Sequence, residues 1–249
     1  MIVDLNSFVG NWNTHAVEGQ PDRVWEELRS YGVEGIFASS LESAWCRNPH
    51  RLNESLYQEA QKTADVWPVP VLDPTVATWE KEVERALQEE RVRLVRLIPN
   101  YSSYQLADVD DFLNVISSTG LGMIVQVCLE DPRRQHPLAQ VPNLPVSGVA
   151  EVAERHSGLT VIVGGAKSAE IRGLKERLLN LPNLYADISQ ADGMDALKVL
   201  VDDGLKDKLV FGSHAPLFML HSAFARILTD LDDASAEAIL GGNALRILS

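Results

Sequence analysis

The sequence predicts an α/β fold, a single (β/α)8 TIM barrel that spans residues 1–249. Eight short runs rich in Val, Ile and Leu alternate with stretches of helical periodicity along the whole chain. These runs mostly lack polar alternation, which is typical of parallel strands covered on both faces. No low-complexity linker divides the 249 residues, and this length is common for one barrel.

The expected strands and helices follow one another at regular intervals. The strands are Ile2–Leu5, Val33–Ala38, Val66–Leu72, Val92–Ile98, Gly122–Leu129, Leu159–Val163, Leu184–Ile188 and Lys208–Phe211. Apolar residues at helical spacing predict the helices between them. These helices are Asp22–Ser30, Asn53–Ala64, Thr78–Glu90, Asp108–Thr119, Ser147–His156, Ser168–Leu179, Gly193–Val201 and a helical region from about His221.

Local signals mark several helix ends. Thr78 is a residue type that caps helix N-termini, and acidic residues follow it. Gly32, Gly120 and Gly158 each lie between a helix and a strand, where glycine commonly ends a helix. A doubly wound open sheet is the alternative fold, but it normally has a glycine-rich turn after its first strand. Residues 6–10, NSFVG, are not such a turn, which favours the barrel.

Composition narrows the classes of partner. The net charge of −13 argues against nucleic acid or an anionic membrane as the main partner, because both bind basic surfaces. Cys46 and Cys128 form no disulfide or metal-binding pattern, and we expect reduced thiols. With no apolar run of 18 residues and no signal peptide pattern, the expected location is the cytoplasm. The apolar content of the helices is compatible with a homodimer, although no interface is identified.

Seven stretches stand in the order of motifs known from one family of barrel enzymes. They are DLNSF, YGVEGIFASS, VPVLDP, VRLVRLIPNY, LYADIS, LVFGSHAP and GGNALRIL. The last two are the most specific, since they resemble G-S-D-x-P and G-N-A-x-R-L-L. Over nearly its full length the chain resembles the amidohydrolase-related (amidohydrolase 2) barrels, which include aminocarboxymuconate semialdehyde decarboxylase and 2-pyrone-4,6-dicarboxylate lactonase. The resemblance implies a TIM barrel with its site at the mouth.

The same resemblance implies positions for metal-binding residues, and this chain has other residue types there. Metal-binding members have two histidines on strand one, usually one after strand five, often one after strand six, and an aspartate on strand eight. The corresponding positions here are Asn6, Phe8, Gln126, residues 163–165 and His214. Phe and Gly offer no lone pair, and amide oxygens are weak zinc ligands. We therefore expect a degenerate metal site and no cofactor. The alternative is one divalent metal, such as zinc, held by other histidines: His50, His136, His214 and His221.

Candidate site residues lie at the ends of the expected strands. His214 is the candidate general base, because an unperturbed imidazole titrates near pH 6.5; a structural histidine is the alternative. Arg96 is expected to clamp a substrate carboxylate if it points inward, and otherwise to pair with a helix acid. Asn6 and Gln126 are expected to orient the substrate. Asp4, the second candidate catalytic residue, needs a partner, so we expect Asp4, Arg96 and His214 to form a charge-paired cluster.

Two loops complete the expected site. Arg133 and His136, in EDPRRQHP, are expected to form an anion-binding lid, with a solvated charged loop as the alternative. Tyr101 and Tyr104 are expected to contact a planar substrate or a developing oxyanion, unless they pack the loop against the barrel. The favoured function is a metal-independent hydrolase that acts on a small carboxylated substrate. A lyase acting on such a substrate is the second choice. The alternatives are a non-catalytic barrel that binds a ligand or partner protein, and a hydrolase with an altered metal site.

Overall fold

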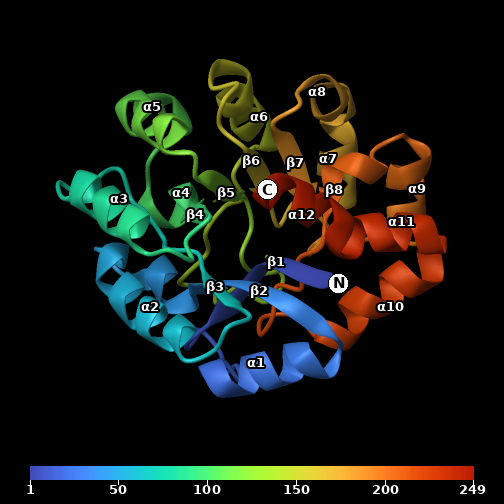
Figure 1. The fold of residues 1–249 in the computed structure, drawn as a ribbon, viewed down its shortest axis with the longest axis horizontal. Helices are drawn as coiled ribbons and strands as arrows, with labels where there is room; N and C mark the ends of the chain where they lie inside the picture. The colour runs from blue at the N-terminus through green and yellow to red at the C-terminus, as the bar shows by residue number, and fades with distance from the viewer.

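A computed structural model describes all 249 residues and confirms the (β/α)8 barrel (Figure 1). Each neighbouring pair of strands is parallel. The strands are β1 (Ile2–Val9), β2 (Val33–Ser40), β3 (Val66–Pro68), β4 (Leu94–Leu97), β5 (Gly122–Gln126), β6 (Val161–Gly164), β7 (Leu184–Asp187) and β8 (Leu209–Val210). All eight expected strands are therefore present, with altered ends.

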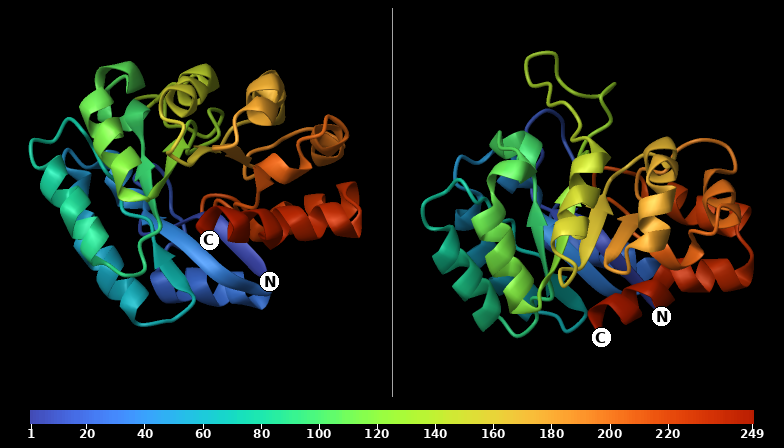
Figure 2. Two further views of the ribbon diagram at one scale, coloured as in Figure 1. Left: turned by 45° about the horizontal axis from the view of Figure 1, so that its top comes forward. Right: turned by 90° about the horizontal axis from the view of Figure 1, so that it is seen from above.

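The helices surround the strands (Figures 1 and 2). They are α1 (Pro21–Ser30), α2 (Asn53–Gln61), α3 (Trp79–Gln88), α4 (Pro99–Ser102), α5 (Asp110–Thr119), α6 (Val146–Arg155), α7 (Ser168–Gly173), α8 (Lys175–Asn180), α9 (Ala196–Asp202), α10 (Leu220–Asp230), α11 (Asp233–Glu237) and α12 (Asn243–Leu248). Short 3-10 turns cover Leu41–Trp45, Pro49–Leu52, Leu106–Asp108 and Lys206–Lys208, and a π-helical turn covers Ala238–Gly242. The loop after β5 extends beyond the strands on the side away from both termini (Figure 2, right).

Backbone hydrogen bonds close the barrel at two seams. The strands form one sheet of β1-β2-β3 and another of β4-β5-β6-β7-β8. Between β3 and β4, Arg96 accepts from Leu72 N at 2.9 Å and donates to Pro70 O at 2.9 Å. Between β8 and β1, Leu5 N donates to Phe211 O at 3.0 Å. The eight strands therefore form a continuous ring.

Several boundaries differ from the expectation for local reasons. β3 ends at Pro68 rather than Leu72, because the prolines at 68 and 70 have no N–H for a ladder. The expected helix Ser168–Leu179 divides into α7 and α8. Gly120 has the expected left-handed φ of +79° after α5. Gly158 is not left-handed, and α6 ends earlier, at Arg155.

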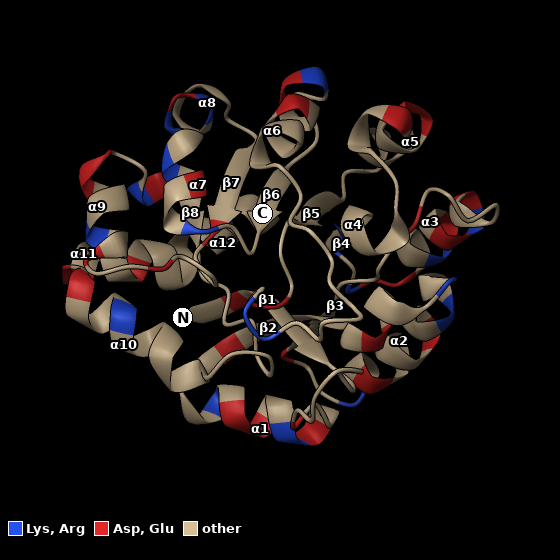
Figure 3. Cartoon of the chain, turned by 180° about the vertical axis from the view of Figure 1, so that it is seen from behind, with Lys and Arg blue, Asp and Glu red and all other residues tan.

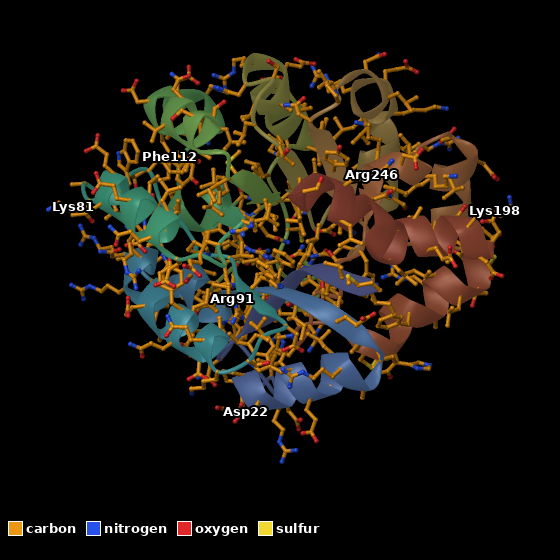
Figure 4. All side chains as sticks on the ribbon, viewed as in Figure 1. Asp22, Lys81, Arg91, Phe112, Lys198 and Arg246 are labelled. Carbon is orange, nitrogen blue, oxygen red and sulfur yellow. The ribbon has the colours of Figure 1, made fainter.

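Buried side chains form three clusters, and Figure 4 shows them filling the space between helices and strands. The largest lies between the strands and the helices. A second fills the lower barrel and includes Val3, Leu94, Ile124 and Val210. Charged residues lie mainly on the outer helices, as Figure 3 shows, and the labelled Lys198 is an example in Figure 4. None of the helices combines the length and the apolar character needed to cross a bilayer.

Candidate functional site

A buried arginine lies at the centre of the barrel. Arg96 points inward from β4 and is 0% exposed. Its Nε donates to Ser39 Oγ at 2.7 Å, and its Nη1 donates to Asn6 Oδ1 at 2.5 Å and to Gln126 Oε1 at 2.6 Å. The guanidinium carbon lies 4.3 Å from the centre of the Phe8 ring, a cation–π contact. Residues of β1, β2, β4 and β5 thus enclose one cation, whose Nη2 has no partner.

An amide connects this cation to a buried carboxylate. While Asn6 Oδ1 accepts from Arg96, Asn6 Nδ2 donates to Asp187 Oδ2. Asp187 also accepts from Gly165 N at 3.0 Å and from Ser189 N at 2.7 Å. Burial lowers the pKa of Arg96 to about 9, against the opposing effect of Asp187, so the guanidinium stays charged at neutral pH. Burial also raises the pKa of Asp187, although its hydrogen bonds oppose this.

Glycine on β6 makes room for the amide of Gln126. A Cβ on Gly164 would lie 2.7 Å from Gln126 Oε1, closer than real Cβ contacts allow. Gly165 has a φ of +72°, and a Cβ there would lie 2.6 Å from Gln126 Nε2. A side chain at either position would displace the amide that accepts from Arg96. Gln126 can therefore take this position only because strand six ends in glycines, which carry no side chain that could bind a metal.

The donor set at this centre does not fit a metal ion. Both amide oxygens that face the centre, from Asn6 and Gln126, already accept from the Arg96 guanidinium. A divalent cation placed there would meet a fixed positive charge. No group of three or more His, Cys, Asp or Glu side chains converges anywhere in the chain. Metal chemistry at this centre therefore lacks suitable ligands.

The alternative metal set is also not assembled, because its four histidines have separate environments. His50 Nε2 accepts from Asp73 N at 2.9 Å, and His136 Nδ1 accepts from Leu138 N at 3.1 Å. His221 is exposed on α10, and His214 is fully buried. The alternative of one metal held among His50, His136, His214 and His221 is therefore not supported by this structure.

Asp4 holds the seam between β1 and the segment after β8. Its Oδ1 accepts from Ser213 N at 3.0 Å and from Asn6 N at 3.0 Å, and its Oδ2 accepts from Ser213 Oγ at 2.5 Å. It forms no ion pair with Arg96, and the expected Asp4–Arg96–His214 cluster is not found. The carboxylate that reaches Arg96, through Asn6, is Asp187. Burial raises the pKa of Asp4 to about 6, despite the opposing hydrogen bonds from Ser213.

We expect Asp4 to make stability fall as the pH rises. Its folded-state pKa of about 6 exceeds the ordinary value of 3.8, so folding favours the protonated form. This contribution is fully present below pH 3.8 and is lost as the pH rises through 6. Relative to Asp4→Asn, the wild type should lose roughly 2 kcal/mol between pH 4 and pH 7, measured by urea unfolding. A difference between the two proteins that does not change with pH would contradict this.

His214 lies beside the centre but is held as a neutral ring. Its Nε2 is 2.7 Å from Leu129 O and its Nδ1 is 3.2 Å from Ser189 Oγ. Phe8 and Phe218 pack edge-on against the imidazole. Because a carbonyl can only accept, Nε2 carries the proton and Nδ1 accepts from Ser189. Burial lowers the pKa of His214 to about 3, and its backbone φ of +59° is left-handed.

An aromatic plug covers the centre of the mouth. Its three rings are Trp12, Trp45 and Tyr101, with centroids 5.3–6.1 Å apart. Aliphatic side chains from the ends of other strands, such as Val71 and Ile98, join the same buried cluster. Arg96, beneath the plug, therefore has no direct route to solvent in this conformation.

A cavity of about 230 Å³, here called the mouth cavity, opens beside the plug. It is formed by the loops after β5, β6, β7 and β8 and by α10. Three cations, Arg133, Lys167 and Arg226, line it together with Asp131 and Asp192. Its polar wall also contains Ser189, Gln190 and Ser213, all of them nearly buried. The excess of cationic side chains suits an anionic molecule despite the negative charge of the whole chain.

Arg226 and Lys167 take different roles in the cavity wall. Arg226 donates to the carbonyl oxygens of Ala191, Ser189 and Ser222, so it supports the segment that carries Ser189. Lys167 Nζ has one loose contact, 3.8 Å from Asp192 Oδ2. Lys167 is therefore the cation with the most freedom to bind a ligand.

The remaining candidate residues lie outside the centre. Arg133 lines the mouth cavity but is bound to Asp131 through Nε and Nη2. His136 is exposed in the same loop and does not line that cavity. Tyr104 is buried with its hydroxyl unpartnered, and Tyr101 belongs to the plug. Asn6 and Gln126, in contrast, belong to the centre, where they accept from Arg96, and they do not line the mouth cavity.

Sequence reasoning missed Asp187, Ser189, Lys167 and Arg226. The first two lie in LYADIS, at the end of strand seven, and this place at a strand end was the available signal. Lys167 follows Gly165 and Ala166, just after strand six. Arg226 lies on a helix, and nothing in the local pattern distinguishes it from a surface arginine.

The fold and the mouth cavity define a (β/α)8 barrel with a cavity at the C-terminal ends of its strands. A family model described as Amidohydrolase matches residues 17–249, and the chain belongs to that family. No curated protein sequence matches the chain.

Solved structures resemble the chain at low sequence identity. An uncharacterised TIM-barrel protein from Bordetella bronchiseptica has a TM-score of 0.71 at 19% identity, covering 93% of this chain and 83% of that one. A probable 2-pyrone-4,6-dicarboxylic acid hydrolase from Acinetobacter baumannii, with citric acid bound, has a TM-score of 0.69 at 13% identity, covering 99% and 98%. The 2,6-dihydroxybenzoate decarboxylase from Rhizobium has a TM-score of 0.63 at 17% identity, covering 90% and 86%. These likenesses establish the fold.

Proposed function

We propose that the chain is a metal-independent hydrolase that acts on a small carboxylated lactone or ester in the mouth cavity. The observation that carries this proposal is the position of Ser189. Ser189 lines the cavity, and its hydroxyl oxygen lies 3.2 Å from His214 Nδ1. His214 itself does not line the cavity, and Ser189 is the cavity residue that its Nδ1 contacts.

The reaction would proceed through an acyl group on Ser189. The Ser189 oxygen attacks the substrate carbonyl carbon, and its proton passes to His214 Nδ1. The bond to the leaving alkoxide then breaks, and the same proton moves to that oxygen. Water hydrolyses the acyl group by the same route. The Leu129 carbonyl fixes the imidazole tautomer, as the carboxylate does in serine hydrolase triads.

The low pKa of His214 restricts the substrates. An imidazole whose pKa is about 3 is a weak base, so attack is efficient only on an activated carbonyl. Lactones and activated esters meet this condition better than amides do. A small volume and three nearby cations favour substrates with one or two carboxylates. The hydrolase name and the citric acid of the Acinetobacter baumannii neighbour agree with this substrate class.

Lys167→Met should raise KM for such a substrate by about tenfold with little change in kcat, because one charge-assisted contact to the carboxylate is lost. The assay uses chelator-treated protein and a panel of small lactones with and without carboxylates. Lys198→Met, on the exposed face of α9, is the matched control and should leave both constants unchanged. Activity that disappears with the chelator and returns with zinc would refute the proposal.

The same burial of His214 favours a second candidate, a non-catalytic binder of small carboxylates. Calorimetry separates the two: saturable binding of dicarboxylates without turnover of any lactone or ester supports the binder.

Pairing of two copies stays a prediction, and sedimentation would test it.

A further inference from the structure

A second cavity, here called the rim cavity, lies on the other half of the mouth. It has a volume of about 700 Å³ and is formed by the segments that follow β2, β3 and β4. Its lining shares no residue with the mouth cavity. Barrels of this kind build their ligand sites from such segments at the C-terminal ends of the strands.

Two arginines without protein partners line the rim cavity. Arg47 and Arg51 are exposed, and neither forms a side-chain hydrogen bond or an ion pair. Among the other arginines of the chain, only Arg134 shares this property, although carboxylates are abundant in a chain of net charge −13. Two free guanidiniums at one cavity create a local positive field in an acidic protein and suit carboxylates.

The same cavity also offers an unused acceptor. Asp73 is nearly buried, and its Oδ1 accepts from Thr75 N at 2.8 Å and from Thr75 Oγ1 at 2.7 Å. Its Oδ2 has no hydrogen-bond partner, yet it is not among the sealed polar atoms of the chain. A carboxylate oxygen that remains accessible beside two guanidiniums is positioned to accept from a hydroxyl group of an anionic ligand.

A fixed tyrosine completes the wall. Tyr101 lines the cavity, and its ring is held by Trp12 and Trp45 of the plug. The Tyr101 hydroxyl has no protein partner and is not sealed. Burial raises the pKa of Tyr101, so the phenol stays protonated and can donate. The wall therefore presents two cations, one neutral donor and one acceptor.

We propose that the rim cavity is a second binding site for a small carboxylate that also carries a hydroxyl group. Arg47 and Arg51 bind the carboxylates, and the ligand hydroxyl donates to Asp73 Oδ2. The site is separate from the mouth cavity and does not depend on hydrolysis there.

Cys46 provides a local readout of this site. It lines the rim cavity and is exposed, whereas Cys128, the other cysteine, is buried. L-malate at ten times its dissociation constant should slow alkylation of Cys46 by iodoacetamide by about tenfold, because the bound form is protected. Succinate, which has the same carbon chain without the hydroxyl, should protect more weakly. Asp73→Asn should reduce the difference between the two acids.

Charge variants test the assignment. Arg47→Gln and Arg51→Gln should each raise the malate concentration needed for protection by about tenfold. Arg134→Gln is the matched control and should leave protection unchanged. The proposal is overturned if malate gives no protection, or if protection survives in the Arg47→Gln/Arg51→Gln variant. It is also overturned if Lys167→Met removes protection, since the ligand would then lie in the mouth cavity.

Discussion

Replacing Arg96 with Met is expected to lower the free energy of unfolding by about 3–5 kcal/mol, the usual effect of removing one member of a buried charge network. The substitution keeps the length of the side chain but leaves the oxygens of Asn6 and Gln126 without their donor. It also leaves Asp187, fully buried, without the cation that it reaches through Asn6. Urea unfolding at pH 7 measures the change.

Matched variants separate charge from packing. Arg134→Met removes an arginine that has no partner and should change stability by less than about 0.5 kcal/mol. Asp187→Asn in the Arg96→Met background should recover part of the loss, because it removes the uncompensated anion. Should Arg96→Met not fold, Arg96→Lys keeps the charge but loses the fork geometry, and an intermediate loss is expected. A stability equal to wild type in Arg96→Met would show that the central cation is dispensable.

The architecture of the barrel could be predicted from sequence because each strand carries its own local signal. Runs such as Gly122–Leu129 are continuous and β-branched, and strands buried on both faces require that composition. The closure of the ring was inferred from the number of such runs and from the resemblance, not from any single residue. The boundaries were less predictable, as β3 illustrates: the two prolines shorten its ladder although its hydrophobic pattern continues.

The candidate site was predicted only in part, because side-chain partners depend on contacts that are distant in sequence. Arg96 was recognised as a candidate, and its inward orientation follows from the alternation along β4. Its partner was misassigned to Asp4, because the bond that Asn6 makes to Asp187 spans 181 positions of the chain. His214 was expected to be a general base, because it follows the last strand and an unperturbed imidazole titrates near neutral pH. Its contacts with Leu129, 85 residues away, and with two phenylalanine rings give it a different environment.

A chain of hydrogen bonds joins the centre to the mouth cavity. It runs from Arg96 to Asn6, from Asn6 to Asp187, and from the Asp187 carboxylate to the backbone N–H of Ser189. The central cation is thus linked to the cavity by this chain, and also through Gln126, which donates to the Cys128 carbonyl that accepts from Gln190 of the cavity wall. Arg96 is in this sense a positioning residue for Ser189 rather than a group that contacts a substrate.

Ser189→Ala is expected to reduce kcat by at least about a thousandfold on any lactone or ester that the chain hydrolyses, because it removes the nucleophile and leaves the base without a proton to accept. KM should change little, since the cations that bind the carboxylate are untouched. Single-turnover kinetics with an activated ester measures the acylation and deacylation steps. Mass spectrometry of the quenched wild-type reaction should find the acyl group on the peptide that contains Ser189.

Two comparisons make this test specific to the Ser189–His214 pair. Ser222→Ala removes another hydroxyl that lines the mouth cavity but does not contact His214, and it should alter kcat by less than about threefold. His214→Asn should lose about as much activity as Ser189→Ala, and the double variant should lose no more, because residues that act as a unit are not additive. If Ser189→Ala keeps full activity, water attacks the substrate directly and the serine is part of the wall only. In that case the weak base buried behind it has no role in turnover.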